Sequence, residues 1–219
     1  MTSAKDEILG RIRRAVHDVP AEERPEDVAV ERGYREEDDV PREEIVERFA
    51  ENVAEYEATV RRVDETSLLE AIAEACRKRG VRQLVVPADL PEEWIPEGAE
   101  PLRDGVDGRP LTNEELDKSD GALTGCSLGI AQTGTIVLDA GERQGRRALT
   151  LLPDYHLCIV REDQIVGLVP KAFAKLADAV KGEGRAITFI SGPSATSDIE
   201  LDRVEGVHGP RTLEVLIVG

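Results

Sequence analysis

The sequence predicts an α/β fold of three layers with a mostly parallel sheet, preceded by an N-terminal helical segment. Helical and strand-like patterns alternate between residues 41 and 87, and this order is typical of a parallel sheet with right-handed crossovers. The short apolar run at residues 83–87 indicates a buried parallel strand. Two β-rich runs near the C-terminus, residues 187–190 and 213–218, are expected to close the sheet.

The first 40 residues are predicted to form a helix followed by an acidic linker. The helix covers residues 3–17, and its apolar face consists of Ile8, Leu9, Ile12 and Val16. Residues 18–41 are rich in proline and acidic side chains, which is typical of a linker. We therefore expect an N-terminal segment, residues 1–40, and a single α/β domain, residues 41–219.

The alternation begins at Pro41, which is favoured in the first turn of a helix. A short strand is expected at residues 58–63. Thr66 is predicted to cap a third helix, and Gly80 is predicted to end it. The next strand is the apolar run already described.

The second half is predicted to be richer in strands. A short helix around Trp94 precedes another strand, and Thr112 opens a capped helical turn. The β-rich runs are expected to form a hairpin or meander beside the main sheet; they are residues 130–138, 148–152 and 157–160. A later helix, residues 170–180, is expected to turn four apolar side chains inward: Phe173, Leu176, Ala177 and Val180.

Composition excludes several classes of protein. The net charge of −17 disfavours DNA, RNA and anionic membranes as partners, because phosphate groups would be repelled. No run approaches the ~20 apolar residues of a membrane span. The N-terminus lacks the apolar core of a signal peptide, so we expect a cytoplasmic protein.

The three cysteines, Cys76, Cys126 and Cys158, are far apart and have no histidine at metal-ligand spacing. An iron–sulfur cluster or a structural zinc ion normally needs about four ligands, so we expect no such cofactor in this chain. Cys76 and Cys158 fall in core patterns. Cys126, in a Thr-Gly-Cys-Ser turn, is the one thiol with a functional case, although packing is the favoured interpretation.

The last quarter of the chain carries the first candidate site. A strand-like run leads into small residues whose main-chain amides are suited to holding an anion. The predicted ligand-binding residues of this segment are Ser191, Gly192 and Ser194. His208 follows in a glycine-containing loop, where we predict a catalytic role, and Arg211 is predicted to bind a carboxylate or phosphate.

Three stretches carry a resemblance to a known family. They are SGPSATSDIE together with GVHGPRT, the run from Thr124 to Leu138, and the run from Gly145 to His156. Together they span residues 121–219 and closely resemble the lactate utilization protein C family of the LUD domain superfamily. The resemblance implies a fold like that of the NagB, RpiA and CoA-transferase group, with ligands at the carboxyl ends of parallel strands.

The matched stretches contain further candidates. Thr124 and Gly125 open one of them, and we predict that both bind ligand. The turn Gln132, Thr133, Gly134 and Thr135 either approaches a ligand or forms a turn in which Gly134 adopts a positive φ. Gln132 stands where the family often has an acidic residue, and glutamine cannot act as the carboxylate nucleophile of a CoA-transferase.

His156 is the second predicted catalytic residue. Histidine acts as a general base near neutral pH, and Asp154, two residues away, is expected to share its face of the strand and to orient it. The alternative interpretation is a histidine that hydrogen-bonds a main-chain carbonyl at the start of a strand.

Two functions fit these features. The resemblance implies a component of an L-lactate oxidation system that converts lactate to pyruvate, in which partner proteins carry the iron–sulfur clusters. We expect residues 191–194, His208 and the turn at residues 132–135 to line one pocket for a small carboxylate or for residues of a partner protein. The alternative is an independent transferase or isomerase that binds a phosphorylated or CoA-linked molecule. The chain has no GxGxxG fingerprint, so a Rossmann NAD site has no support.

Overall fold

The structure is a computed structural model that describes residues 3–20, 24, 31, 33–35, 37–182, 184–196, 204–205 and 209–219. The chain divides into two compact units, Met1–Tyr34 and Arg35–Gly219. Within the described residues, no helix is both long enough and apolar enough to cross a membrane.

Among the described residues of the first unit, one helix is present, α1 (Ala4–Ala15). Ser3 and Asp6 form a capping box at its start, because the main-chain amide of each donates a hydrogen bond to the side chain of the other. The side chains of Ile8 and Ile12 are more than half exposed, and no residue of α1 is buried. The helix is therefore held by local hydrogen bonds and not by a core.

Six parallel strands form the central sheet of the second unit, in the order β1-β12-β7-β4-β2-β3. Their bounds are β1 (Thr59–Val63), β12 (Thr212–Val218), β7 (Tyr155–Arg161), β4 (Gly121–Thr124), β2 (Gln83–Pro87) and β3 (Glu100–Asp104). Because all six run the same way, their carboxyl ends lie at one edge of the sheet. The predicted α/β class with a mostly parallel sheet is confirmed.

A smaller, four-stranded sheet has the order β8-β5-β6-β9. Its strands are β8 (Ile165–Val166), β5 (Leu128–Ile130), β6 (Thr135–Leu138) and β9 (Thr188–Ile190). β5 and β6 form an antiparallel hairpin, so a hairpin does lie beside the main sheet, within the first of the three β-rich runs. The placement of residues 157–160 beside the main sheet was wrong, because they belong to β7, which lies between β12 and β4 in the central sheet. β9 was expected to close the main sheet, but it pairs with β6 instead. β10 (Ala195–Thr196) and β11 (Val204–Glu205) form a separate two-stranded sheet.

The described part of this unit contains the α-helices α2 (Arg42–Glu55), α3 (Leu68–Arg79), α4 (Asn113–Asp117) and α5 (Val169–Lys181). Gly80 ends α3 with a φ of 67°, and a capping box of Thr112 and Glu115 opens α4, both as predicted. The prediction for Thr66 was wrong. It lies inside a 3₁₀ turn, Glu65–Ser67, that precedes α3, so it does not cap the helix.

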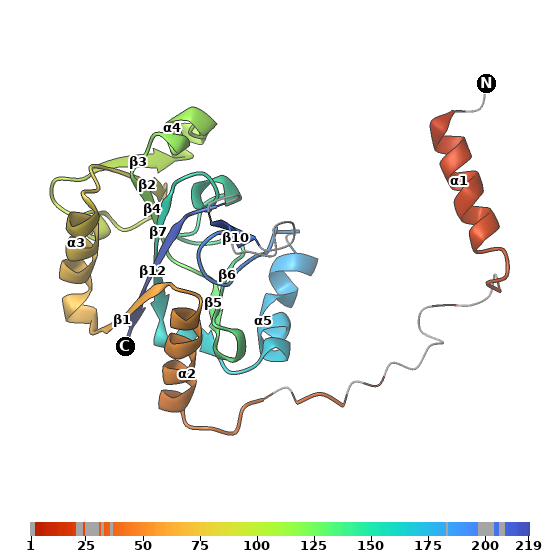
Figure 1. The fold of residues 1–219 in the computed structure, drawn as a ribbon, viewed down its shortest axis with the longest axis horizontal. Helices are drawn as coiled ribbons and strands as arrows, with labels where there is room; N and C mark the ends of the chain where they lie inside the picture. Colours follow the sequence, from red (N-terminus) through yellow and green to blue (C-terminus); the bar gives the residue numbers. More distant parts are fainter. Residues whose placement is uncertain are drawn as a thin grey trace. The chain divides into compact units, whose positions relative to one another are not determined.

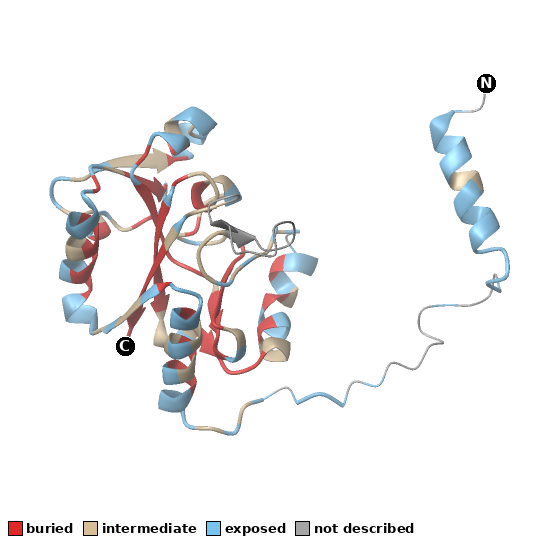
Figure 2. Ribbon diagram, in the orientation of Figure 1, coloured by how far each residue is buried: buried red, intermediate tan, exposed pale blue. Residues whose placement is uncertain are grey.

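The helices and the small sheet cover both faces of the central sheet (Figure 1). Successive residues of β7 alternate between these faces: Leu157 and Ile159 pack with α3, whereas Cys158 and Val160 pack with α2. The small sheet packs beside α2, and α5 covers its other face. The strands of the central sheet are accordingly the most buried part of the unit (Figure 2).

The predicted inward face of α5 was partly wrong. The buried residues are Ala172, Leu176 and Ala179, whereas Phe173 and Val180 are 58% and 49% exposed. The small alanine side chains let the helix lie close to the sheet. Phe173 stacks on Phe189 of β9, with 5.7 Å between the ring centroids, and stays at the surface.

The run at residues 148–152 was predicted to be a strand, but its first part lies in a 3₁₀ helix, Arg147–Thr150. The Arg147 guanidinium donates to the Thr150 carbonyl over 2.7 Å and closes the turn. Just before it, Arg146 donates to the buried Asp104 carboxylate at the end of β3 over 3.0–3.2 Å. These contacts fold the segment over the sheet edge instead of letting it pair as a strand.

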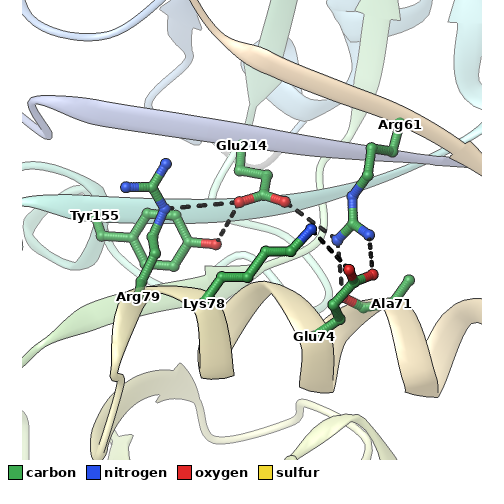
Figure 3. Close-up of polar contacts among 7 residues, drawn as sticks. All are labelled: Arg61, Ala71, Glu74, Lys78, Arg79, Tyr155 and Glu214. Carbon is green, nitrogen blue, oxygen red and sulfur yellow. Dashed lines mark hydrogen bonds and ion pairs between the residues drawn. The ribbon is translucent and has the colours of Figure 1, made fainter.

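A buried carboxylate, Glu214 of β12, ties α3 to the central sheet (Figure 3). Glu214 is 6% exposed and accepts a hydrogen bond of 3.0 Å from the Tyr155 hydroxyl. Arg61 lies 3.2 Å from one carboxylate oxygen, and Arg79 lies 3.7 Å from the other and over the Tyr155 ring. Burial, with the nearby Glu214 carboxylate, raises the pKa of the Tyr155 hydroxyl far above its usual value. The network therefore keeps its tyrosine neutral and its carboxylate paired.

Candidate functional site

The best candidate site is a pocket of about 270 Å³ at the carboxyl edge of the central sheet. Gly125 and Cys126 directly follow β4, and Arg161 is the last residue of β7. The lining consists of Trp94, Gly125, Cys126, Ser127, Asp139, Gly141, Glu142, Arg143, Gln144, Ile159, Arg161, Gln164 and Arg185. Open α/β sheets bind their ligands outside the carboxyl ends of the strands, so the pocket lies where this rule expects one.

The pocket also bridges the point where the strand order reverses. The chain runs outward from β2 to β3, returns to β4 on the other side of β2, and continues to β7 and β12. Trp94 follows β2, whereas Gly125 follows β4, and both line the pocket. Connections diverge at such a switch point, which leaves a crevice between the loops.

A strained loop, residues 139–147, forms one wall. Two of its residues that are not glycine have positive φ values, Ala140 with 53° and Arg143 with 60°. The Arg143 amide donates to the Asp89 carboxylate over 2.7 Å, and the Arg143 carbonyl accepts from the Gly125 amide over 2.7 Å. Strained backbone persists where the surroundings hold it, and such residues concentrate at functional sites.

The Arg143 side chain is the most available cation of the pocket. Its guanidinium lies 5.7 Å from the centroid of the Trp94 ring, and 36% of the side chain is exposed. Its ion pair is with Glu142 at 2.9 Å, and the Glu142 side chain is 75% exposed. Exposed pairs of this kind are weak, so the planar guanidinium remains suited to bind a carboxylate.

The other two arginines of the lining are held more firmly. Arg161 donates two hydrogen bonds of 2.8 Å to the Glu65 carboxylate, which lowers the pKa of Glu65. Arg185 lies 3.1 Å from the Asp139 carboxylate. Each of the three arginines of the lining is thus paired with a carboxylate, and the partner of Arg143 is the most exposed of the three. A ligand carboxylate therefore competes most easily for Arg143.

Thr124 and His156, two of the predicted site residues, lie behind the pocket floor. Cys126, on the floor, is 4% exposed. Thr124 and His156 are fully buried, and the Thr124 hydroxyl lies 2.8 Å from Nε2 of His156. Asp154 was expected to orient His156, but it lies 3.5 Å from Arg211. Thr124 and His156 therefore support the floor from within the core, and Gly125 is the predicted residue that lines the pocket.

Other predicted residues gather at the opposite, amino-terminal edge of the sheet. The Thr135 hydroxyl lies 2.7 Å from the Thr133 hydroxyl and 2.8 Å from the Ser191 hydroxyl. Gly192, with a φ of 82°, packs against Tyr56, which precedes β1. The sequence thus correctly grouped Ser191 with the threonine turn, but the structure separates this group from the carboxyl-edge pocket.

Ser194 and Arg211 also belong to the amino-terminal edge. The Ser194 amide donates to the Pro210 carbonyl over 2.8 Å. Arg211, 63% exposed, directly precedes β12. His208 lies outside the described residues, so its predicted catalytic role stays a prediction.

Contacts of the Gln132 turn favour the structural interpretation of this segment. The Gln132 side chain accepts a hydrogen bond of 3.1 Å from the amide of Val169, the first residue of α5. Gly134 has a φ of 56°, and a Cβ there would lie 2.5 Å from the Asn52 main chain in α2. The turn therefore joins α2 to α5, and Gly134 provides both the positive φ and the close approach.

Replacing Gly134 with alanine is expected to lower the free energy of unfolding by about 2–3 kcal/mol, because the methyl group adds steric overlap to backbone strain. Urea unfolding measures the loss. Gly80→Ala is the matched control, since Gly80 has a φ of 67° but open space around its Cβ position. Equal losses in the two variants would contradict the close approach to α2.

Sequence reasoning missed the residues that dominate the pocket. It passed over Arg143, and it used Trp94 only as the centre of a short helix. The single tryptophan of the chain and the polar run after a buried strand were the available signals. Trp94 and Arg143 lie close together because Arg143 is hydrogen-bonded to Asp89, which is distant from it in sequence.

The comparisons with known proteins agree with the resemblance stated from the motifs. The family model of the LUD domain matches residues 46–218. The chain belongs to the LUD domain family. This family match covers the whole carboxyl-edge pocket and both sheets.

Among LUD relatives, Lactate utilization protein C of Deinococcus radiodurans is 46% identical over 216 residues, which cover 99% of this chain and 96% of the relative. The uncharacterized protein YkgG of Escherichia coli K12 is 33% identical over 163 residues, 70% of each chain. The crystal structure of a DUF162 family protein from D. radiodurans is similar with a TM-score of 0.71 and 43% identity, over 82% of this chain and 99% of that one.

Proposed function

We propose that this LUD protein is the subunit without clusters in an L-lactate oxidation system, working with iron–sulfur partner proteins. The supporting observation is its 46% identity, along nearly its whole length, to a protein named Lactate utilization protein C. In this proposal lactate loses two electrons and two protons to become pyruvate, and the electrons pass to the clusters of the partners.

The contribution of this chain is to bind the small carboxylate in the carboxyl-edge pocket. Arg143 forms charge-assisted hydrogen bonds to the carboxylate, while the Trp94 ring holds the guanidinium in place. The pocket, at about 270 Å³, has room for a small organic acid and water. Among the described residues, no group of three or more His, Cys, Asp or Glu side chains is arranged to hold a metal ion. In this proposal the partner proteins carry the iron–sulfur clusters.

The proposed location is the cytoplasm. The three cysteines of the chain are free thiols, which is the usual state of cysteine in reducing compartments.

The test is a mild pull-down of the tagged chain from its native host, with iron content and lactate-dependent dye reduction measured on the eluate. We expect iron–sulfur partners to co-elute and the dye to be reduced when L-lactate is added. Deletion of the gene is expected to abolish growth on L-lactate while leaving growth on pyruvate intact, which controls for general defects. Unchanged growth on L-lactate would contradict the proposal.

A further inference from the structure

Two carboxylates that pair with arginines of the pocket differ sharply in burial. Glu142 contacts Arg143 over 2.9 Å, and its side chain is 75% exposed. Asp139, which directly follows β6, contacts Arg185 over 3.1 Å, and its side chain is only 9% exposed. A ligand carboxylate displaces Glu142 at little cost, because the Glu142 side chain then turns into water. Displacing Asp139 would instead leave a buried carboxylate without its cation, which is strongly unfavourable.

The surroundings of Asp139 hold it firmly in the pocket wall. Its Oδ1 accepts a hydrogen bond of 3.1 Å from the Gly141 amide, and its own amide donates to the buried Gln144 side chain over 2.6 Å. The loop backbone also lies directly against the ion pair. A Cβ at Gly141 would lie 2.5 Å from Nη1 of Arg185 and 2.8 Å from Oδ1 of Asp139. The ion pair is therefore packed in place and does not open freely to a ligand.

Charge, and not size, limits what the pocket accepts. At about 270 Å³ the pocket exceeds the volume of a three-carbon acid, since a water molecule takes roughly 30 Å³. One ligand carboxylate is accommodated at Arg143. A second carboxylate on the same ligand would meet Arg161, which has two hydrogen bonds of 2.8 Å to Glu65, and Arg185, which has a buried partner. It would bring an additional negative charge to a wall whose cations are already matched.

We propose that Asp139 is a specificity-determining residue that restricts the pocket to monocarboxylates and excludes dicarboxylates. Its buried carboxylate repels a second carboxylate of a ligand and keeps Arg185 engaged. Repulsion of the wrong ligand is a common source of specificity in proteins. This inference rests on the proposed function, because it takes Arg143 as the residue that binds the first carboxylate. It narrows the substrate class to small acids with a single carboxyl group.

The experiment compares three 2-hydroxy acids as ligands of the full-length chain: L-lactate, L-2-hydroxybutyrate and L-malate. L-2-Hydroxybutyrate is the size control, since it has the four carbons of L-malate but one carboxylate. We expect it to bind with a Kd close to that of L-lactate, and L-malate to bind at least about tenfold more weakly. Titration calorimetry measures each Kd. The fluorescence of Trp94, the single tryptophan of the chain, reports whether the ligand enters the pocket that it lines.

Asp139→Asn keeps the shape of the side chain and removes its charge. We expect this variant to bind L-malate about tenfold more tightly than the wild type does, a gain that a misfolded chain would not produce. Asp154→Asn is the matched control. It also removes a carboxylate that pairs with an arginine, Arg211 at 3.5 Å, but at the amino-terminal edge of the sheet. The control should leave the ratio of the L-malate and L-lactate Kd values unchanged.

Equal affinities of the wild-type chain for L-2-hydroxybutyrate and L-malate would overturn this inference and leave the proposed function intact. This comparison needs no variant. A folded Asp139→Asn chain, as checked by circular dichroism, that binds L-malate no better than the wild type would overturn it too. If L-lactate itself does not bind, the carboxylate pocket and this inference fail together, whereas co-elution with iron–sulfur partners still decides membership of the oxidation system.

Discussion

The Glu214→Ala variant is expected to lose about 3 kcal/mol of unfolding free energy, because it leaves the buried Tyr155 hydroxyl and two partly exposed arginines without their common partner. Glu214 is 6% exposed and accepts from Tyr155 while it pairs with Arg61 and Arg79. Urea unfolding followed by circular dichroism measures the loss. The same variant should also expose more of the α3 face to solvent.

Glu74→Ala is the matched control on the same network. Glu74 lies 2.7 Å from Arg61, but its side chain is 39% exposed, and water replaces it when it is removed. Glu74→Ala should therefore lose far less unfolding free energy than Glu214→Ala. Similar losses in the two variants would show that burial does not set the strength of this network.

Arg143→Ala is expected to raise the lactate concentration that gives half-maximal dye reduction in the purified complex by about 10–100-fold. The estimate corresponds to removing a charge-assisted hydrogen bond to a carboxylate. Arg143→Lys should give a half-maximal lactate concentration between those of Arg143→Ala and the wild type, since lysine keeps the charge but loses the planar guanidinium. Steady-state titration with L-lactate measures each shift.

Arg211→Ala is the control that compares the two edges of the sheet. Arg211 is an exposed arginine at the amino-terminal edge and pairs with Asp154. It should leave the lactate dependence unchanged if the carboxyl-edge pocket binds the substrate. A large shift with Arg211→Ala and none with Arg143→Ala would instead favour the residues that the sequence had singled out.

Local sequence patterns were sufficient for much of the fold. The strand at residues 83–87 agrees residue by residue with β2, and Gly80 ends α3 because a left-handed turn there favours glycine. The inward face of α5 was less predictable, since its periodicity does not reveal that Phe173 has Phe189 as a surface partner. Secondary structure is encoded locally, whereas the choice of packed face depends on the neighbouring layer.

The candidate site was harder to predict, because its geometry depends on contacts between distant parts of the chain. Thr133, Thr135 and Ser191 do meet, as their grouping implied, but at the amino-terminal edge. Arg143 gains its place from a positive φ and from hydrogen bonds to Asp89 and Gly125. Neither feature leaves a periodic pattern in the sequence.

The hydrogen bonds that hold the loop at residues 139–147 have a thermodynamic consequence for ligand binding. The main-chain amide and the main-chain carbonyl of Arg143 are both hydrogen-bonded, and the Arg146 side chain is hydrogen-bonded to Asp104. The loop is therefore ordered when the chain folds, and little conformational entropy remains to be lost when a ligand arrives. Calorimetry should then show a small heat-capacity change on binding, set by the few apolar groups that a small acid covers and not by the ordering of a loop.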